Sequence, residues 1–269
     1  MTGCCTANFN QGWPKFAHAL VYGLPGGGVA VGAYAPVRVD LPGGSTVEVD
    51  TAYPFGDDAT VTVTNNGATH LPVHLRIPGW ATAATVDGQP AANGTMWTGV
   101  APAGKGTAFR VAFNPAIRVE RWFNGAVSVH RGALMYSLPI DANYTVYARH
   151  YGSANMSSDY YLEPTSSWRF AIDVDPGDPA RTLTWRTNGG GGGGGGGAPF
   201  NHTGWPVVIE ATVRALPSWG TAKNSAAAPP ASPACTAARG ACGLPQKVLL
   251  VPHGGTDLRI GELPMSGLT

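Results

Sequence analysis

Two cysteines stand side by side near the start of the chain, at Cys4 and Cys5. A thiol attacks or binds a metal as the thiolate, and coordination to zinc favours the thiolate near neutral pH. Adjacent thiols therefore have the chemistry of a nucleophile or of metal ligands. No histidine or acidic residue lies near them at ligand spacing, so these residues alone favour a structural or incidental pair.

The other two cysteines, Cys235 and Cys242, are separated by six residues in a segment rich in Pro and Ala. A local disulfide, if the compartment is oxidising, and two free thiols both fit this spacing better than a metal site does. A zinc site made from all four cysteines is disfavoured, because their spacing resembles no zinc ribbon.

Several aspartates and histidines also have ligand chemistry. The pair Asp57–Asp58 and the aspartates between Asp173 and Asp178 could bind calcium, but turn aspartates that bond their own backbone explain both groups better. His70 and His74 fall in a predicted strand, where their spacing separates them by roughly 13 Å. That is too far to share a metal, so we interpret each as a plain strand or loop residue.

Aromatic residues are the candidates for stacking on sugar rings. Most are expected in a sandwich core, with surface stacking as the alternative. The tryptophans considered are Trp80, Trp97, Trp122, Trp205 and Trp219.

Four Asn-X-Ser/Thr tripeptides favour a secretory route, although such tripeptides also arise by chance. Residues 1–20 lack the basic start and apolar core of a signal peptide, so they leave the compartment open. The tripeptides begin at Asn93, Asn143, Asn155 and Asn201.

The composition indicates a loop-rich β protein. The 269 residues include 38 glycines and 23 prolines, only 12% are charged, and the net charge is +1. That balance gives no reason to expect nucleic acid or an anionic membrane as a partner. The longest apolar runs, such as Val248–Val251, have the length of a strand and not of a membrane span.

The elements that would position these residues follow two periods. Between Asn8 and Tyr22 apolar residues recur every three or four positions, which predicts a short amphipathic helix. From Gly23 the period changes to two, and short strands alternate with turns such as Asn65–Gly67. This spacing is typical of an antiparallel sandwich. Strands are predicted at 29–34, 37–39, 45–50, 60–64, 70–77, 84–86, 107–113 and 117–122.

The second half of the chain shows the same alternation of short strands and turns, but less regularly. Nine consecutive glycines, Gly189–Gly197, bury nothing and predict a disordered loop within the domain. The chain is thus predicted to be all-β. Residues 1–22 contain the short helix, residues 23–123 form a first sandwich, and residues 124–269 form a second sandwich with an Ala/Pro-rich loop at 221–245. Strands of the second are predicted at 126–130, 133–138, 143–151, 168–174, 207–213, 248–251 and 258–260.

Motifs spread along the chain resemble glycoside hydrolase family 127, the β-L-arabinofuranosidases. They lie in the family's order and span nearly the whole sequence. Residues 4–16 resemble the end of the catalytic (α/α) barrel, so residues 1–22 would be a remnant of it. The other motifs are Tyr53-Pro54-Phe55-Gly56, Leu75-Arg76-Ile77-Pro78-Gly79-Trp80, Val129-His130-Arg131-Gly132-Ala133-Leu134-Met135-Tyr136 and Leu250-Val251-Pro252-His253-Gly254 with Leu258-Arg259-Ile260.

The resemblance implies roles for the first cysteine pair. Cys4 would be the nucleophile of a retaining hydrolysis of arabinofuranosides, and Cys4 and Cys5 would form part of a zinc site. The family's general acid/base and its other zinc ligands lie upstream of the pair. The isolated chain is therefore expected to lack a substrate pocket, to hold zinc poorly and to be inactive.

Two alternatives remain beside a hydrolase portion. A carbohydrate-binding module predicts a planar patch of exposed aromatic rings on one sheet. A structural or interaction fragment predicts an open apolar face, formed partly by the helix from Phe9 to Leu20, through which the chain would associate.

Overall fold

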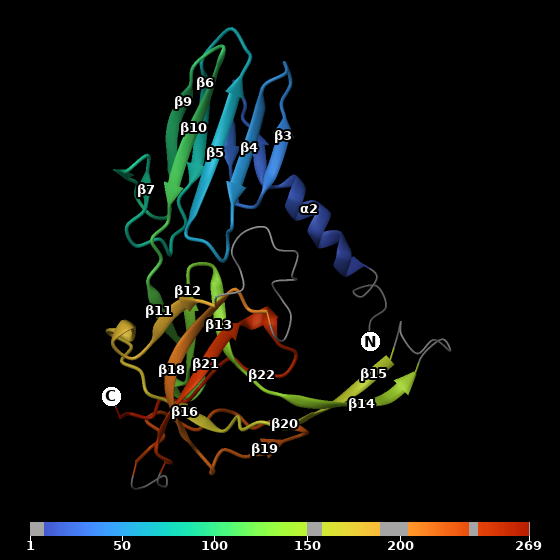
Figure 1. Ribbon diagram of the computed structural model, residues 1–269, viewed down its shortest axis with the longest axis vertical. Helices are drawn as coiled ribbons and strands as arrows, with labels where there is room; N and C mark the ends of the chain where they lie inside the picture. The colour runs from blue at the N-terminus through green and yellow to red at the C-terminus, as the bar shows by residue number, and fades with distance from the viewer. Residues whose placement is uncertain (1–7, 150–157, 189–203, 237–241, 269) are drawn as a thin grey trace. The chain divides into compact units, whose positions relative to one another are not determined.

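The computed structural model describes residues 8–149, 158–188, 204–236 and 242–268 (Figure 1). The chain divides into two compact units, Met1–Ala116 and Ile117–Thr269. Both consist mainly of strands, which confirms the predicted all-β class. None of the helices in these described ranges has the length and apolar character that a membrane crossing requires.

A short helical segment leads into the first unit. The 3₁₀ turn η1, Phe9–Gln11, is followed by α2, Gly12–His18. Pro14 falls in the first turn of α2, where its missing N–H is not needed. The predicted helix to Tyr22 is too long, because Leu20 turns inward and the following strand β1, Val21–Gly23, joins a sheet.

Two sheets form the first sandwich, and their inward side chains make one buried cluster. Along β4 and β5 every second residue is buried, as the period-two pattern predicts. The four-stranded sheet runs β1, β2 (Val29–Val31), β6 (Leu71–Arg76) and β9 (Met96–Ala101); the six-stranded sheet runs β3 (Val37–Asp40), β4 (Thr46–Thr51), β5 (Asp58–Asn65), β10 (Lys105–Ala112), β7 (Thr85–Val86) and β8 (Gln89–Pro90).

One strand pair departs from the antiparallel arrangement that the sequence predicts. β2 and β6 run parallel, with Val29 opposite Val73 and Val31 opposite Leu75. Parallel neighbours need a crossover. Here the chain between them supplies β3, β4 and β5 of the opposite sheet before it returns.

An aromatic cluster closes one part of this core. Phe113 is fully buried, and its ring lies 4.9 Å from that of Tyr34 and 5.6 Å from that of Trp80. The hydroxyl of Tyr34 donates to the carbonyl of Arg76 at 2.8 Å. Burial raises the pKa of Tyr34, so the hydroxyl stays protonated and remains a donor.

The second unit is built on one large sheet. β11 lies before the predicted boundary at 123, but it pairs with β12 of the second unit. The predicted last two strands, β21 and β22, do not pair with each other; both pair with β13. The sheet runs β11 (Ile117–Arg121), β12 (Val127–Arg131), β13 (Leu134–Pro139), β21 (Pro245–Pro252), β18 (Val207–Ala215) and β16 (Phe170–Ile172), with β17 (Thr184–Thr187) on β18 and β22 (Arg259–Ile260) on β13.

Two hairpins do not pair with this sheet and form separate two-stranded sheets. β14 (Ala142–Arg149) pairs with β15 (Ser158–Pro164), and β19 (Thr221–Ala222) pairs with β20 (Ser225–Ala226). The second hairpin falls within the predicted Ala/Pro-rich loop at 221–245. Beyond it, Ala234 is buried and its N–H donates to the carbonyl of Met265. That segment is therefore anchored, whereas the predicted glycine loop, Gly189–Gly197, lies outside the described residues.

Candidate functional site

The predicted nucleophile and zinc ligands, Cys4 and Cys5, lie outside the described residues. The described part of the chain begins next to them with η1 and α2, none of whose residues is buried. Phe9, Trp13 and Phe16 are 78%, 69% and 48% exposed. An apolar surface thus exists where the sequence predicts one, although the predicted contributor Leu20 is 4% exposed and lies inside the sandwich.

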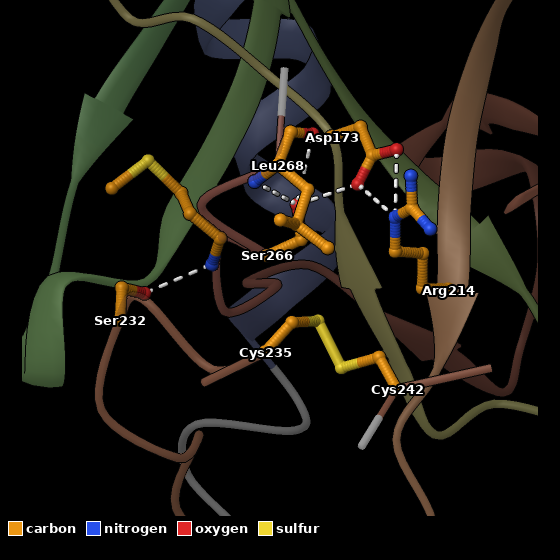
Figure 2. Close-up of a disulfide and its surroundings, with 8 residues drawn as sticks. Asp173, Arg214, Ser232, Cys235, Cys242, Ser266 and Leu268 are labelled. Atoms are coloured by element: carbon orange, nitrogen blue, oxygen red, sulfur yellow. Dashed lines mark hydrogen bonds and ion pairs between the residues drawn. A yellow bond between two sulfur atoms is a disulfide. The ribbon is translucent and has the colours of Figure 1, made fainter. Parts of the chain in front are cut away.

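The other two cysteines form a disulfide (Figure 2). The N–H of Cys235 donates to the carbonyl of Ser266, and the N–H of Gly243, next to Cys242, donates to the carbonyl of Ala215 at the end of β18. The bridge therefore joins two anchored segments. It also leaves neither sulfur as a thiolate ligand, which argues against a zinc site made from all four cysteines.

Asp173, considered above as a calcium ligand, has protein partners instead. Its carboxylate accepts from Arg214 Nε at 3.1 Å on both oxygens and from the hydroxyl of Ser266 at 2.5 Å (Figure 2). Asp175 forms the predicted backbone turn, because its Oδ1 accepts from the N–H of Gly177 at 2.8 Å. In the described ranges no three His, Cys, Asp or Glu side chains come together as a metal site.

The first of two serine–histidine contacts joins β13 to the turn after β21. Ser137 Oγ lies 2.7 Å from His253 Nδ1, and Arg259 Nε donates to His253 Nε2 at 3.0 Å. Since an arginine only donates, Nε2 must accept and Nδ1 must carry the proton. The imidazole therefore donates to Ser137, so it is not placed to remove the serine proton.

Burial lowers the pKa of His253, and the positive charge of Arg259 lowers it further. The neutral ring is thus the form that the folded chain favours. This contact ties β13, β22 and the η4 turn, His253–Gly255, together. We assign it a structural role.

The second contact joins two residues of β12 to the tryptophan that follows β11. Trp122 Nε1 donates to Ser128 Oγ at 2.7 Å, and that oxygen lies 2.8 Å from His130 Nε2. Burial lowers the pKa of His130, while nearby Glu120 opposes the shift. Ser128 is only 1% exposed, so no substrate reaches its hydroxyl. We therefore assign this cluster a structural role as well, and not a catalytic one.

Neither serine–histidine contact was predicted from the sequence, although Trp122 was considered for stacking and His130 and His253 fall in the family motifs. A signal for the second was present, because Ser128 and His130 are two apart in a predicted strand and therefore share a face. The first joins residues 116 positions apart, Ser137 and His253, which only the fold brings together.

One cavity of the second unit has a volume of about 570 Å³ and lies beside the segment from Pro164 to Phe170. Among the described residues that line it, Arg169 alone is charged, and none carries a carboxylate or a thiol. Glycoside hydrolysis ordinarily uses two such groups across the scissile bond. The cavity therefore lacks the chemistry of a hydrolytic site.

The aromatic side chains divide between core and surface. Trp219 is 2% exposed and Trp122 is 51% exposed, while Trp80, Trp97 and Trp205 are intermediate. The exposed tyrosines of the β14–β15 hairpin pair edge to face, Tyr144 with Tyr160 at 76° and Tyr147 with Tyr161 at 66°. Such pairs do not form the planar patch expected of a stacking platform.

The histidines of the first sandwich take separate roles. His70 is exposed, and His74 Nδ1 lies 3.1 Å from the hydroxyl of Thr98 on β9. The interpretation of His74 as a plain strand residue agrees with this pairing.

The fold and its sites thus define a chain of two β units, of which the first is a sandwich of two sheets and the second is built on one large sheet. Residues 28–102 match the family model described as β-L-arabinofuranosidase, GH127 middle domain. This match and the structural similarities below confirm the resemblance inferred from the motifs. No curated protein matches the chain.

Two solved structures share the fold. One, named glycoside hydrolase, is 17% identical with a TM-score of 0.62, and the match covers 98% of this chain and 40% of that one. The other, a GH127 β-L-arabinofuranosidase from Geobacillus stearothermophilus T6, is 15% identical with a TM-score of 0.54, covering 94% and 35%. The chain therefore spans less than half the length of either structure.

Proposed function

We propose that this chain is the β-sandwich portion of a glycoside hydrolase that acts on β-L-arabinofuranosides. The observation that carries the proposal is the similarity over 98% of the chain to a structure named glycoside hydrolase, together with the GH127 family match at residues 28–102. In this proposal the two sandwiches brace a catalytic portion and shape access to it.

The catalytic contribution of the chain would come from Cys4 and Cys5. Thiolates are preferred zinc ligands, so the chemistry of this pair fits half of a tetrahedral zinc site. Bound zinc would favour the thiolate form, and Cys4 would act as the nucleophile at the anomeric carbon. By the family resemblance, the remaining zinc ligands and the general acid/base would lie upstream of this pair.

It follows that the isolated chain should bind zinc weakly and should not cleave glycosides. The test is hydrolysis of p-nitrophenyl β-L-arabinofuranoside by the 269-residue chain supplied with stoichiometric zinc. We expect no rate above buffer. Turnover that disappears in Cys4→Ala would contradict the proposed inactivity and would locate a complete site within this chain.

The native product decides between an enzyme portion and a separate module. Its mass, or the transcript sequence upstream of Met1, is the first measurement to make. A longer product that contains an upstream glutamate and further metal ligands should hydrolyse the arabinofuranoside and lose that activity in Cys4→Ala. A product that begins at Met1 would leave a bracing or binding role.

A further inference from the structure

The tripeptide Asn93-Gly94-Thr95 forms a rigid turn at the surface of the first sandwich, between β8 and β9. Gly94 has φ of 71°, and its N–H donates to the carbonyl of Ile77 at 3.0 Å. The N–H of Ile77 in turn donates to the carbonyl of Thr95 at 2.8 Å, and the hydroxyl of Thr95 donates to the carbonyl of Ala92 at 2.7 Å. The turn is therefore held by bonds that do not use the Asn93 side chain.

The Asn93 side chain itself is free to carry a large substituent. Asn93 is exposed, and its one described bond runs from Nδ2 to the carbonyl of Gly79 at 3.3 Å. A carboxamide nitrogen has two hydrogens, so one remains available in this arrangement. A glycosylated amide keeps one hydrogen, so Asn93 Nδ2 remains a donor after modification.

The disulfide between Cys235 and Cys242 is an independent observation that points the same way. Disulfides form and persist in oxidising compartments, among them the lumen in which asparagine glycosylation takes place. This bridge closes a short loop whose flanking residues bond to Ser266 and Ala215. A bridge held in this way fits an oxidising compartment, which is where an Asn-X-Thr acceptor would be used.

From these two observations we propose that Asn93 carries an N-linked glycan. In the transfer, Asn93 Nδ2 forms a bond to the anomeric carbon of a lipid-pyrophosphate-linked oligosaccharide. The bond from that carbon to the pyrophosphate oxygen breaks, the lipid pyrophosphate leaves with the electron pair, and one amide proton is released. No electrons are exchanged with another reactant.

The chain provides a matched internal control in Asn66. Asn66 is also exposed, lies in a turn, and bonds a glycine carbonyl through Nδ2, that of Gly44 at 2.8 Å. Alanine stands two residues after it, so it lacks the hydroxyl that the acceptor motif requires. Of the other acceptor motifs, Asn143 lies in strand β14 opposite Glu163, while Asn155 and Asn201 lie outside the described residues.

The test is glycopeptide mass spectrometry of the protein purified from its native source. We expect glycan mass on the Asn93 peptide, conversion of Asn93 to aspartate by peptide-N-glycanase, and an unmodified Asn66 peptide. The same digest without reduction should contain the Cys235–Cys242 cross-linked peptide. An Asn93 peptide without glycan overturns the proposal, whether or not the cysteines are bridged.

Variants expressed through a eukaryotic secretory host provide the second measurement. Asn93→Gln and Thr95→Ala should each lose the mass of one glycan, whereas Thr95→Ser and Asn66→Gln should keep it. Circular dichroism of Asn93→Gln shows whether the variant is folded. An unchanged mass in folded Asn93→Gln would overturn the assignment of Asn93.

Discussion

Hydrogen-bond direction decides what the individual residues of this chain do. A serine next to a histidine has the composition of a hydrolytic pair, but Arg259 donates to the second nitrogen of His253 and fixes the ring as a donor to Ser137. Ser128 has a histidine neighbour as well, and Trp122 covers it. Residue types alone would favour catalysis at Ser137 and at Ser128. The hydrogen bonds and the burial show that both serines have structural roles.

The two partly buried histidines, His130 and His253, should make the stability of the chain depend on pH. Burial lowers the folded-state pKa of His130 and His253 below the ordinary value of about 6.5. The unfolded chain then binds more protons near pH 6. The contribution of the two histidines to the free energy of unfolding is therefore complete above about pH 6.5, and it is lost as the pH drops through the folded-state pKa. Urea unfolding at a series of pH values from 7.5 to 5 measures this dependence.

His253→Gln isolates one of the two contributions. At pH 7.5 we expect it to lower the free energy of unfolding by about 1–3 kcal/mol, because the bonds to Ser137 and Arg259 are lost. The decline in stability toward pH 5 should also be shallower than in the unmodified chain. His70→Gln, at an exposed histidine, is the control. An equally steep decline in His253→Gln would show that His253 does not contribute to the pH dependence.

At the scale of elements, single side chains close turns between strands. Asn65 ends β5 and is 2% exposed; its Nδ2 donates to the carbonyls of Thr69 and Ala101, both at 2.9 Å, and its Oδ1 accepts from the N–H of Gly67. Asn65→Ala leaves two carbonyls and one N–H without these partners. We expect a loss of about 2–4 kcal/mol in the free energy of unfolding, measured by urea denaturation.

Asn66→Ala serves as its control, since Asn66 is exposed and its side chain donates to the carbonyl of Gly44 at the surface. It should cost no more than about 0.5–1 kcal/mol. Equal losses in the two variants would contradict the buried role of Asn65.

The disulfide is expected to stabilise the second unit through the loop that it closes. For Cys235 and Cys242, seven positions apart, the loop-entropy relation gives about 2–3 kcal/mol. Replacing both cysteines by serine should lower the thermal midpoint of unfolding by the amount that corresponds to this loss of free energy. Thermal unfolding of the oxidised chain, the reduced chain and the double variant gives the comparison. The reduced chain and the double variant should agree, and an oxidised chain no more stable than either would contradict the expectation.

Elements were predictable from the sequence where alternation was clean. β4 and β5 alternate valine with polar residues, and their predicted positions and buried faces are confirmed. β9 was missed, because its outward positions include apolar Met96 and Val100, and Gly99 interrupts it. That glycine is required by packing, since a Cβ there would overlap the ring of Trp97.

At the scale of the whole molecule, class and family resemblance followed from the sequence because they depend on many short signals in order. The parallel pair of β2 and β6 did not, since parallel pairing depends on where a strand returns and not on its residues. The cluster at Ser137 was likewise fixed only by pairing across the large sheet, where Ser137 lies opposite Val251, two residues before His253. The proposed nucleophile, Cys4, stays a prediction from resemblance.

The exposed aromatic face of η1 and α2 should govern how the isolated chain behaves in solution. Phe9, Trp13 and Phe16 leave a large apolar surface in water, which favours association. Sedimentation of the 269-residue chain should show concentration-dependent association, and the triple replacement of these residues by serine should reduce it. Because none of the three is buried, the free energy of unfolding should change by less than about 1 kcal/mol.

A second exposed aromatic group supplies the control. Tyr147 and Tyr161 on the β14–β15 hairpin are 65% and 55% exposed and pack against each other. If any exposed aromatic surface caused association, replacing these two by serine would reduce it as much as the helix variant does. If the surface of η1 and α2 is responsible, the hairpin variant should associate like the unmodified chain. A helix variant that still associates would assign the contact to another surface and remove the support for docking through α2.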